Sequence, residues 1–299
     1  MTVQDSFPIR IIGERINPGF KSTKALFDSQ DIAGLQALAV RQAEAGARWL
    51  NVNIGARALT EPDWMATVIR ALQQVVTVPL SFDFPSRRVQ QVCLEAYDAA
   101  RAGGELPIVN SITEHRWDLM ELYGEHRFKV ILMASERVET VDGASVAKGN
   151  KTADEIHATA RRAALRLMHD YGMPADDIFV DMSVSAIIAD TEGLNRGTVE
   201  AIRRIGADPE LAGVHMMGGL SNIGQQLPPK AADGSDLKHA LECAFLTLTV
   251  PLGFDTVLGT PWRNYAPLPA EHHVMRTYRD FLEQSGTQAL RVVRRFYRG

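Results

Sequence analysis

The sequence predicts a (β/α)8 TIM barrel made of a single domain that covers residues 1–299. Short apolar segments rich in β-branched residues alternate with longer amphipathic segments along the whole chain. Strict alternation of strands and helices indicates a parallel sheet. Eight such units in a chain of this length favour a closed barrel over an open, doubly wound sheet. No linker rich in Pro, Gly or Ser divides the chain, so we expect one domain.

The eight expected strands are short and apolar. They cover residues 9–13, 49–54, 78–84, 107–111, 129–134, 178–182, 214–217 and 256–258.

The expected helices follow the strands one by one. They cover residues 31–46, 61–75, 87–102, 114–124, 154–171, 198–205, 237–250 and 271–284. In the first of them Ile32, Leu35 and Ala39 recur at spacings of three and four, which is typical of one helix face. Pro62 suits the first turn of the second helix. We expect loops over the polar residues 135–151 and 218–236, and we expect residues 289–298 to extend the last helix.

Composition excludes several classes of function. The chain has 32 Lys and Arg against 36 Asp and Glu, and this net charge of −4 offers no support for nucleic-acid binding. Two cysteines, Cys93 and Cys243, are too few for a disulfide framework or a zinc site. No apolar run approaches the ~18 residues of a membrane span, and the first ten residues do not resemble a secretion signal. We therefore expect a cytoplasmic enzyme that acts away from membranes.

Polar side chains end most of the expected strands, where barrel enzymes place their active sites. The candidates are Glu14, Asn53, Asp83, Asn110 and Asp181 at strand ends, with Asn222 and Gln225 just beyond the seventh strand. Such a ring is costly to desolvate unless it binds something. Zinc would require His or Cys, and neither stands at these ends, whereas magnesium could use the carboxylates. Amides mixed with isolated acids also suit a neutral heterocycle such as a pterin. Spacing alone does not choose among these ligands.

Six of the seven candidates also have a structural interpretation. Asp83 could cap the helix that follows its strand, and Asn53 and Asn110 could satisfy backbone groups. Asp181 could pair with an arginine, as Glu14 could with its neighbour Arg15. Asn222 lies among glycines, where asparagine commonly forms turns. A structural role is thus open to each of six residues, Asp83, Asn53, Asn110, Asp181, Glu14 and Asn222. Their joint placement on successive strand ends nevertheless favours a binding site.

Six motifs in this order resemble the pterin-binding methyltransferases. They are Ile-Ile-Gly-Glu-Arg-Ile-Asn at 11–17, Asn-Val-Asn-Ile-Gly at 51–55, Phe-Asp at 82–83, Val-Asn-Ser at 109–111, Val-Asp at 180–181 and Gly-Leu-Ser-Asn-Ile at 219–223. More narrowly, the set is similar to the methyltetrahydrofolate:corrinoid methyltransferases, which include the folate domain of cobalamin-dependent methionine synthase. The similarity spans nearly the whole chain.

The resemblance implies a role for each candidate. Asp83, Asn110 and Asp181 would bind the pterin ring of tetrahydrofolate or methyltetrahydrofolate, and Asn222 would approach N5, the nitrogen that carries the methyl group. Gln225 would lie close to the pterin. Glu14 and Asn53 would support these residues, and no metal site is implied.

The methyl group would move between N5 and a corrinoid, in a direction that the sequence does not give. The N5 amine is a poor leaving group, so a hydrogen bond that strengthens as charge develops on N5 would assist the transfer. The chain lacks an Asp-x-His-x-x-Gly cobalamin signature. We therefore expect the cobalamin to arrive on a separate corrinoid protein, and the family resemblance implies a homodimer.

Two alternatives remain open at this point. Dihydropteroate synthases share the barrel and the pterin pocket, but they typically carry Ser-Arg-Lys where this chain has Ser221, Asn222 and Ile223. The second alternative is a pterin-binding barrel without catalytic activity.

Overall fold

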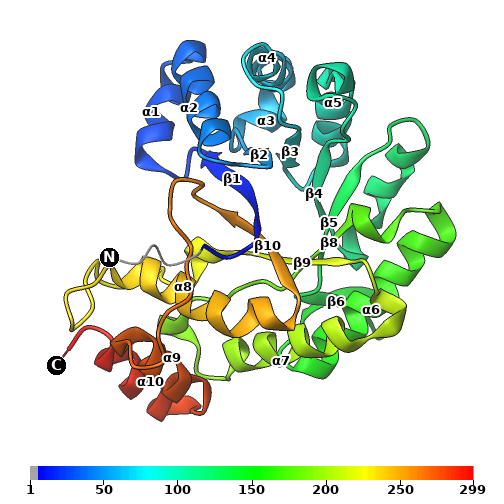
Figure 1. The fold of residues 1–299 in the computed structure, drawn as a ribbon. Helices are drawn as coiled ribbons and strands as arrows, with labels where there is room; N and C mark the ends of the chain where they lie inside the picture. The colour runs from blue at the N-terminus through cyan, green and yellow to red at the C-terminus, as the bar shows by residue number, and fades with distance from the viewer. Residues whose placement is uncertain (1–5, 299) are drawn as a thin grey trace.

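The computed structural model describes residues 6–298, and it contains a closed parallel barrel of eight strands. The strands follow one another around the barrel in the order β1-β10-β9-β8-β5-β4-β3-β2. Every neighbouring pair is parallel, and helices surround the ring of strands (Figure 1). The predicted (β/α)8 fold is confirmed.

The barrel strands coincide with, or overlap, the eight predicted segments. They are β1 (Arg10–Ile16), β2 (Trp49–Val52), β3 (Leu80–Asp83), β4 (Ile108–Ile112), β5 (Lys129–Met133), β8 (Ile178–Asp181), β9 (His215–Gly219) and β10 (Phe254–Gly259).

Helices occupy the connections between the strands. The α-helices are α1 (Lys21–Asp28), α2 (Ile32–Glu44), α3 (Arg57–Thr60), α4 (Pro62–Gln73), α5 (Arg87–Ala96), α6 (Ala153–Tyr171), α7 (Leu194–Ala207), α8 (Leu237–Thr249), α9 (His273–Leu282) and α10 (Gly286–Arg295). The 3-10 helices are η1 (Ala99–Ala102), η2 (Glu114–Gly124), η3 (Ala175–Asp177), η4 (Ile187–Ala189), η5 (Pro209–Leu211), η6 (Leu220–Asn222) and η7 (Val250–Leu252).

The predicted helix over 114–124 is present as the 3-10 helix η2, which has a kink at Arg116, where φ is −117° and ψ is 44°. The predicted extension of the last helix is wrong. Residues 289–298 do not extend α9. The backbone is extended at Ser285, and Gly286 has a φ of +58°, so the chain turns and α10 begins there as a separate helix.

The prediction of a loop over residues 135–151 is wrong, because most of this segment forms an antiparallel hairpin. Strand β6 (Glu136–Val141) pairs with β7 (Ala144–Gly149). Asp142 and Gly143 join them with φ values of +50° and +80°. Positive φ at both central residues matches the twist of a two-residue hairpin turn, and Asp-Gly is a preferred sequence for it.

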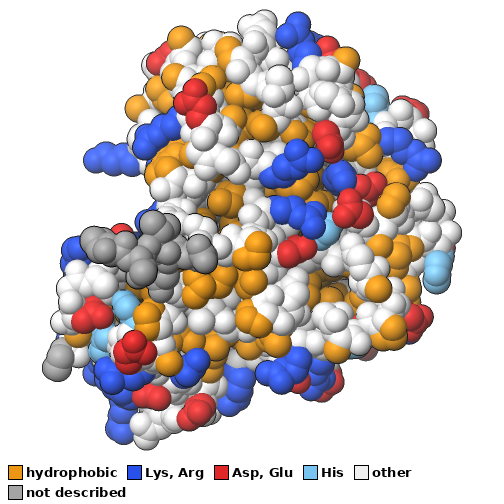
Figure 2. Space-filling model, viewed as in Figure 1, with side chains coloured by type: hydrophobic (Ala, Val, Ile, Leu, Met, Phe, Trp, Pro, Cys, Tyr) orange, Lys and Arg blue, Asp and Glu red, His pale blue; other side chains and the backbone are white. Residues whose placement is uncertain are grey.

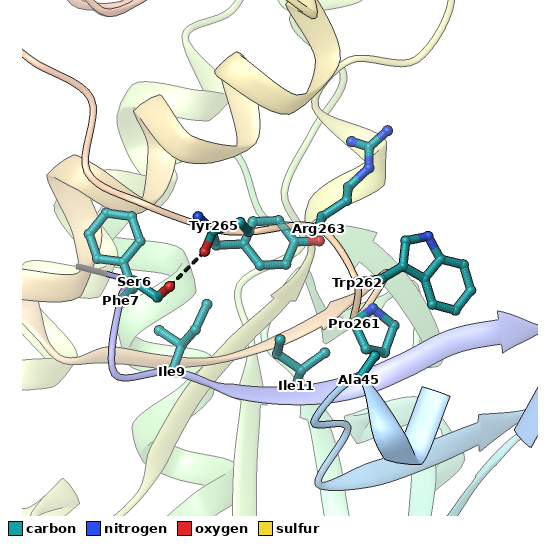
Figure 3. Close-up of a pocket in the computed structure, with 10 residues that line it drawn as sticks. Ser6, Phe7, Ile9, Ile11, Ala45, Pro261, Trp262, Arg263 and Tyr265 are labelled. Carbon is teal, nitrogen blue, oxygen red and sulfur yellow. Dashed lines mark hydrogen bonds between the residues drawn. The ribbon is translucent and has the colours of Figure 1, made fainter. Parts of the chain in front are cut away.

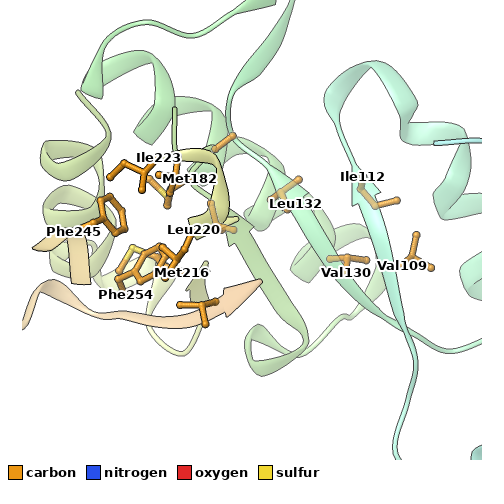
Figure 4. Packing of buried hydrophobic residues seen from close by; sticks show 14 of the residues in the cluster. Val109, Ile112, Val130, Leu132, Met182, Met216, Leu220, Ile223, Phe245 and Phe254 are labelled. Carbon is orange, nitrogen blue, oxygen red and sulfur yellow. The ribbon is translucent and has the colours of Figure 1, made fainter. Parts of the chain in front are cut away.

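Apolar side chains form two separate clusters. The smaller one fills the barrel interior with Ile12, Trp49, Ile108, Ile131, Phe179 and Met217. There the rings of Trp49 and Phe179 meet edge to face, with their centroids 5.4 Å apart. The larger cluster lies between the strands and the surrounding helices; Figure 4 shows part of it, with Val130 of β5, Met216 of β9 and Phe245 of α8. The interior cluster fills the barrel between the strands, so no ligand site lies inside it.

Charges of both signs are interspersed on the face that Figure 2 shows, where blue and red side chains lie next to one another. No helix among residues 6–298 is both long enough and apolar enough to cross a bilayer.

Candidate active site at the carboxyl ends of the strands

A polar layer lies next to the apolar cluster of the barrel interior, on the side of the strands' carboxyl ends. Side chains two residues apart on a strand share a face. Two residues beyond the members of the interior cluster come Glu14, Asn51, Asn110, Met133, Asp181 and Gly219. The same step along β3 and β10 leads from Ser81 to Asp83 and from Leu258 to Thr260. The strand period thus brings these side chains together at the carboxyl ends of the strands, where barrel enzymes bind their substrates.

Asn51 is the centre of a hydrogen-bonded network within this layer. Its side chain is 1% exposed, and its Nδ2 donates to Asp83 Oδ2 at 3.0 Å. Its Oδ1 accepts from Ser81 Oγ at 3.2 Å and from Asn110 Nδ2 at 3.3 Å. Asn53 Nδ2 donates to the same Asp83 oxygen at 3.2 Å. Asp83 and Asn110, which also pair in the β3–β4 register, are therefore held in fixed orientations while keeping some exposure to solvent.

Asp181 belongs to the same layer and has no cationic partner among residues 6–298. Its Oδ1 accepts the backbone N–H of Ser183 at 2.7 Å. Burial raises the pKa of Asp181 to about 6; this hydrogen bond opposes the shift, and the charge of Asp83 adds to it. A carboxyl with this pKa can take a proton near neutrality, so it can accept or donate a hydrogen bond to a bound heterocycle.

Glu14 joins the loops that follow β9 and β10. It accepts hydrogen bonds from Ser221 Oγ at 3.0 Å and from Thr260 Oγ1 at 2.8 Å, and it is 7% exposed. Burial raises its pKa, and the two hydroxyl donors oppose that change. Through Ser221, Glu14 anchors the short helix η6 that carries Asn222.

Asn222 and Gln225 lie at the rim of the layer. Asn222 is the last residue of η6 and is half-buried, whereas Gln225 is exposed. Gln225 Nε2 donates to Asn222 Oδ1 at 2.7 Å. With its carbonyl oxygen occupied in this way, Asn222 keeps its Nδ2 hydrogens free to donate to a ligand.

A cavity of about 490 Å³ opens beside this rim. Glu14, Ser221, Gln225 and Thr260 contribute to its wall. The rest is lined by Asn17, Gly19, Phe20 and four charged side chains, those of Arg15, Lys238, Glu242 and Arg263. The cavity therefore begins at the polar layer and continues outward between strongly charged groups.

A second cavity, of about 350 Å³, lies on the outer side of β1 (Figure 3). Ile9, Ile11 and Tyr265 line it, and Ser6 Oγ donates to Asn264 Oδ1 at 2.6 Å on its edge. It contains none of the strand-end candidates, so we do not place the active site there.

The structure separates the predicted candidates into three groups. Asp83 and Asn110 meet through Asn51, and Asn53 donates to Asp83. Asp181 lies near Asp83, and Glu14 anchors the loop of Asn222 and Gln225. The structural interpretations of three of them are not supported. Helix α5 begins at Arg87 after Ser86, and Asp83 does not cap it. Glu14 bonds two hydroxyl groups, and within residues 6–298 it forms no ion pair with Arg15; Asp181 likewise has no arginine partner there.

Sequence reasoning missed Asn51. The motif at 51–55 offered two asparagines, and the prediction chose Asn53. The signal that could have identified Asn51 is the period of two, because it stands two residues after the inward-facing Trp49.

Among residues 6–298 no cluster of three or more His, Cys, Asp or Glu side chains has an arrangement that could hold a metal ion. The polar layer offers hydrogen-bond donors and acceptors to a ligand.

Comparison with known proteins adds a family match. A family model described as "Pterin binding enzyme" matches residues 15–258. A protein of Eubacterium limosum named methylcorrinoid:tetrahydrofolate methyltransferase is 25% identical over 256 residues, with 84% of each chain covered.

Solved structures with a similar fold include two dihydropteroate synthases. The enzyme of Xanthomonas albilineans with 4-aminobenzoic acid gives a TM-score of 0.57 at 17% identity, over 86% of this chain and 88% of that one. The enzyme of Clostridium difficile in the presence of pteroic acid gives 0.56 at 19% identity, over 100% of both chains. At such identities the likeness shows the fold alone.

Proposed function

The chain belongs to the family of pterin binding enzymes, and from this premise we propose that it transfers a methyl group between N5 of tetrahydrofolate and a corrinoid carried by a second protein. The observation that carries the proposal is the polar layer with its fixed carboxylate and amide groups, together with the half-buried Asn222 on η6, a helix that carries no Lys or Arg. The relative named as a methyltransferase supports the same reaction type.

Asp83, Asn110 and Asp181 would bind the pterin ring. A pterin presents an amino group and ring nitrogens along one edge, and carboxylate oxygens are acceptors for such donors. The Asn51 network fixes Asp83 and Asn110 before the ligand arrives, so these side chains lose little conformational freedom on binding. Asp181, with its raised pKa, can adapt its protonation to the ring nitrogen that it faces.

Asn222 would act at N5. When the methyl group leaves N5, its bonding electron pair stays on nitrogen, and the nitrogen must then take a proton. A group that stabilises this nitrogen more in the transition state than in the bound substrate accelerates the transfer. Asn222 is held by Gln225 and, through Ser221, by Glu14, so its position is fixed before reaction.

The corrinoid, when its carrier protein is docked, would supply the cobalt centre that exchanges the methyl group with N5. This chain's part is to bind the pterin, to orient N5 toward the open mouth and to keep Asn222 beside it. Homodimer formation and a cytoplasmic location are further proposals that rest on the family resemblance.

A dihydropteroate-synthase-like activity is the second candidate, since solved structures with a similar fold include dihydropteroate synthases. That reaction condenses a pterin with an aromatic amine. Ser221, Asn222 and Ile223 stand where such synthases typically carry Ser-Arg-Lys, which favours methyl transfer here.

Parallel titration separates the two candidates. We expect calorimetry to show saturable binding of 5-methyltetrahydrofolate and no binding of p-aminobenzoate, either alone or with a pterin pyrophosphate. Condensation of p-aminobenzoate with that pyrophosphate would establish the synthase activity instead. Binding of folate without methyl transfer to cobalamin would leave a non-catalytic pterin-binding protein.

A further inference from the structure

One buried side chain outside the barrel reaches the strand ends that carry Asp83 and Asn110. Gln90 lies on α5, which stands outside the ring of strands, beside β3 and β4 (Figure 1). Its side chain is fully buried. Its Nε2 donates to the backbone oxygens of Phe82 at 2.8 Å, of Phe84 at 2.7 Å and of Asn110 at 3.3 Å. Three main-chain carbonyl groups at the ends of two strands thus meet at one amide nitrogen.

These contacts assign the two ends of the Gln90 amide. A glutamine side chain carries two hydrogens on its nitrogen and none on its oxygen. Three carbonyl oxygens surround one end of the amide, so that end is the donating nitrogen. The Gln90 Oε1 atom, at the other end, is buried and has no hydrogen-bond partner among residues 6–298. Because an unpartnered buried oxygen costs stability, what this side chain contributes is its donation to the main chain.

The sheet is irregular where Gln90 binds it. The β3–β4 register ends at the pair Asp83 and Asn110, and beyond it the Phe84 N–H donates to the Asn110 carbonyl at 3.0 Å. On the other side of β4, the register with β5 shifts between Asn110 and Ile112. Evenly spaced ladder bonds hold the backbone within a parallel sheet. At these strand ends the Gln90 amide supplies part of that support, on both sides of Asp83.

Asn51 and Gln90 hold the same two residues in different ways. Asn51 bonds the side chains of Asp83 and Asn110 within the polar layer. Gln90 bonds the main chain on either side of Asp83 and the main chain of Asn110 itself. The Asn51 network therefore fixes how the two side chains are turned, whereas Gln90 fixes where their backbones stand. Together these contacts define the separation between the carboxylate and the amide.

We propose that Gln90 is a positioning residue for pterin binding, which sets the separation of Asp83 and Asn110 from a buried place behind them. The inference rests on the proposed function, because it takes these two side chains as the ones that bind the pterin. A ring that bonds both must match their separation, and side chains that are fixed in advance lose less freedom on binding. Loss of the Gln90 amide should therefore weaken pterin binding as well as lower stability.

Gln90→Met tests the inference, because methionine keeps an unbranched side chain of similar length and removes the amide. Gln73→Met is the matched control. Gln73 is also buried, on α4, and it bonds the main chain of Asp98 through both ends of its amide, each at 2.9 Å. Asp98 lies in the connection between α5 and β4, which enters β4 at its amino end, away from the polar layer.

Urea denaturation and calorimetry on the full chain give the two readouts. The probes are 5-methyltetrahydrofolate and 6-methyltetrahydropterin, which has the ring system without the aminobenzoyl-glutamate part. Both variants should lower the free energy of unfolding. Only Gln90→Met should weaken binding, by about tenfold for each probe, since two side chains must then be ordered when the pterin binds.

A double-mutant cycle tests whether Gln90 acts through Asn110. In an Asn110→Ala background, the loss of affinity caused by Gln90→Met should fall to about threefold, because only Asp83 is left to be positioned. Gln73→Met should leave the affinity unchanged in both backgrounds. A loss that stays tenfold without the Asn110 side chain would contradict action through this residue.

Wild-type pterin affinity in a folded Gln90→Met, or an equal loss in Gln73→Met, would overturn the positioning role while leaving the proposed function intact. If Gln90→Met does not fold, Gln90→Glu and Gln73→Glu are compared at about pH 5, where a buried carboxyl keeps its proton and donates one hydrogen bond. Gln90→Glu should then bind both probes more weakly than Gln73→Glu, and equal affinities would overturn the role. Failure of the wild-type chain to bind either probe would overturn the proposed function and this inference with it.

Discussion

Replacing Asn51 with alanine should damage both the stability of the barrel and its affinity for a pterin. The substitution removes three hydrogen bonds, to Asp83 Oδ2, Ser81 Oγ and Asn110 Nδ2. Ser81 is fully buried, so its hydroxyl group loses its acceptor in a place that water does not reach. Asp83 and Asn110 keep some exposure, and water can replace part of what they lose.

The magnitude follows from these differences in burial. An unsatisfied buried polar group costs about 1–3 kcal/mol, whereas a group that water can reach costs much less. We therefore expect Asn51→Ala to lower the free energy of unfolding by about 2 kcal/mol. The loss of orientation at two pterin-binding side chains should weaken pterin affinity by about tenfold, since each would have to be ordered on binding.

Urea denaturation and calorimetric titration measure the two effects. Asn53→Ala is the comparison, because Asn53 makes two hydrogen bonds against three for Asn51, donating to Asp83 at 3.2 Å and accepting from the Gly55 backbone N–H at 2.7 Å, and because it lies nearer the solvent. It should cost less than Asn51→Ala in both measurements. Wild-type stability and affinity in Asn51→Ala, or a larger loss in Asn53→Ala, would refute the network as the support of the site.

Three further outcomes are expected. Since the pKa of Asp181 is raised to about 6, the folded chain binds this proton more tightly than the unfolded chain does. The proton's contribution to stability is therefore complete below about pH 4 and is lost as the pH rises through about 6. Asp181→Asn should flatten the pH dependence of the free energy of unfolding over that interval, and an unchanged profile would count against the raised pKa. Asn222→Ala should lower the rate of single-turnover methyl transfer ~10²–10³-fold with a much smaller loss of folate affinity, whereas equal losses would indicate ordinary ground-state binding. Glu14→Ala should slow methyl transfer because the Ser221 hydroxyl loses its acceptor. Glu14→Gln retains one carbonyl oxygen as an acceptor, so in the same assay it should transfer the methyl group faster than Glu14→Ala.

The fold and the strand-end candidates could be predicted because they depend on patterns within single segments. Alternation of apolar strands with amphipathic helices indicated the barrel, and parallel strands bring their carboxyl ends to one edge. Asp83 and Asp181 end β3 and β8, and Asn110 lies two residues before the end of β4, so their placement followed without any knowledge of packing.

Other features depend on information that a single segment does not carry. Choosing Asn51 over Asn53 required knowing that Trp49 faces the barrel interior. The hairpin β6–β7 is polar and exposed, so it lacks the apolar face that marks most strands, and only Asp142 and Gly143 signalled its turn. The contact of Gln90 with the ends of β3 and β4 is visible only after α5 is seen to pack beside them.

Single-turnover methyl transfer tests the central claim most directly. The chain is mixed with 5-methyltetrahydrofolate and cob(I)alamin, and the formation of methylcobalamin is followed by its absorbance, with Asn222→Ala run alongside. We predict methylcobalamin formation that depends on the chain and falls steeply in the variant. Saturable folate binding without any chain-dependent methylcobalamin would contradict the proposed reaction.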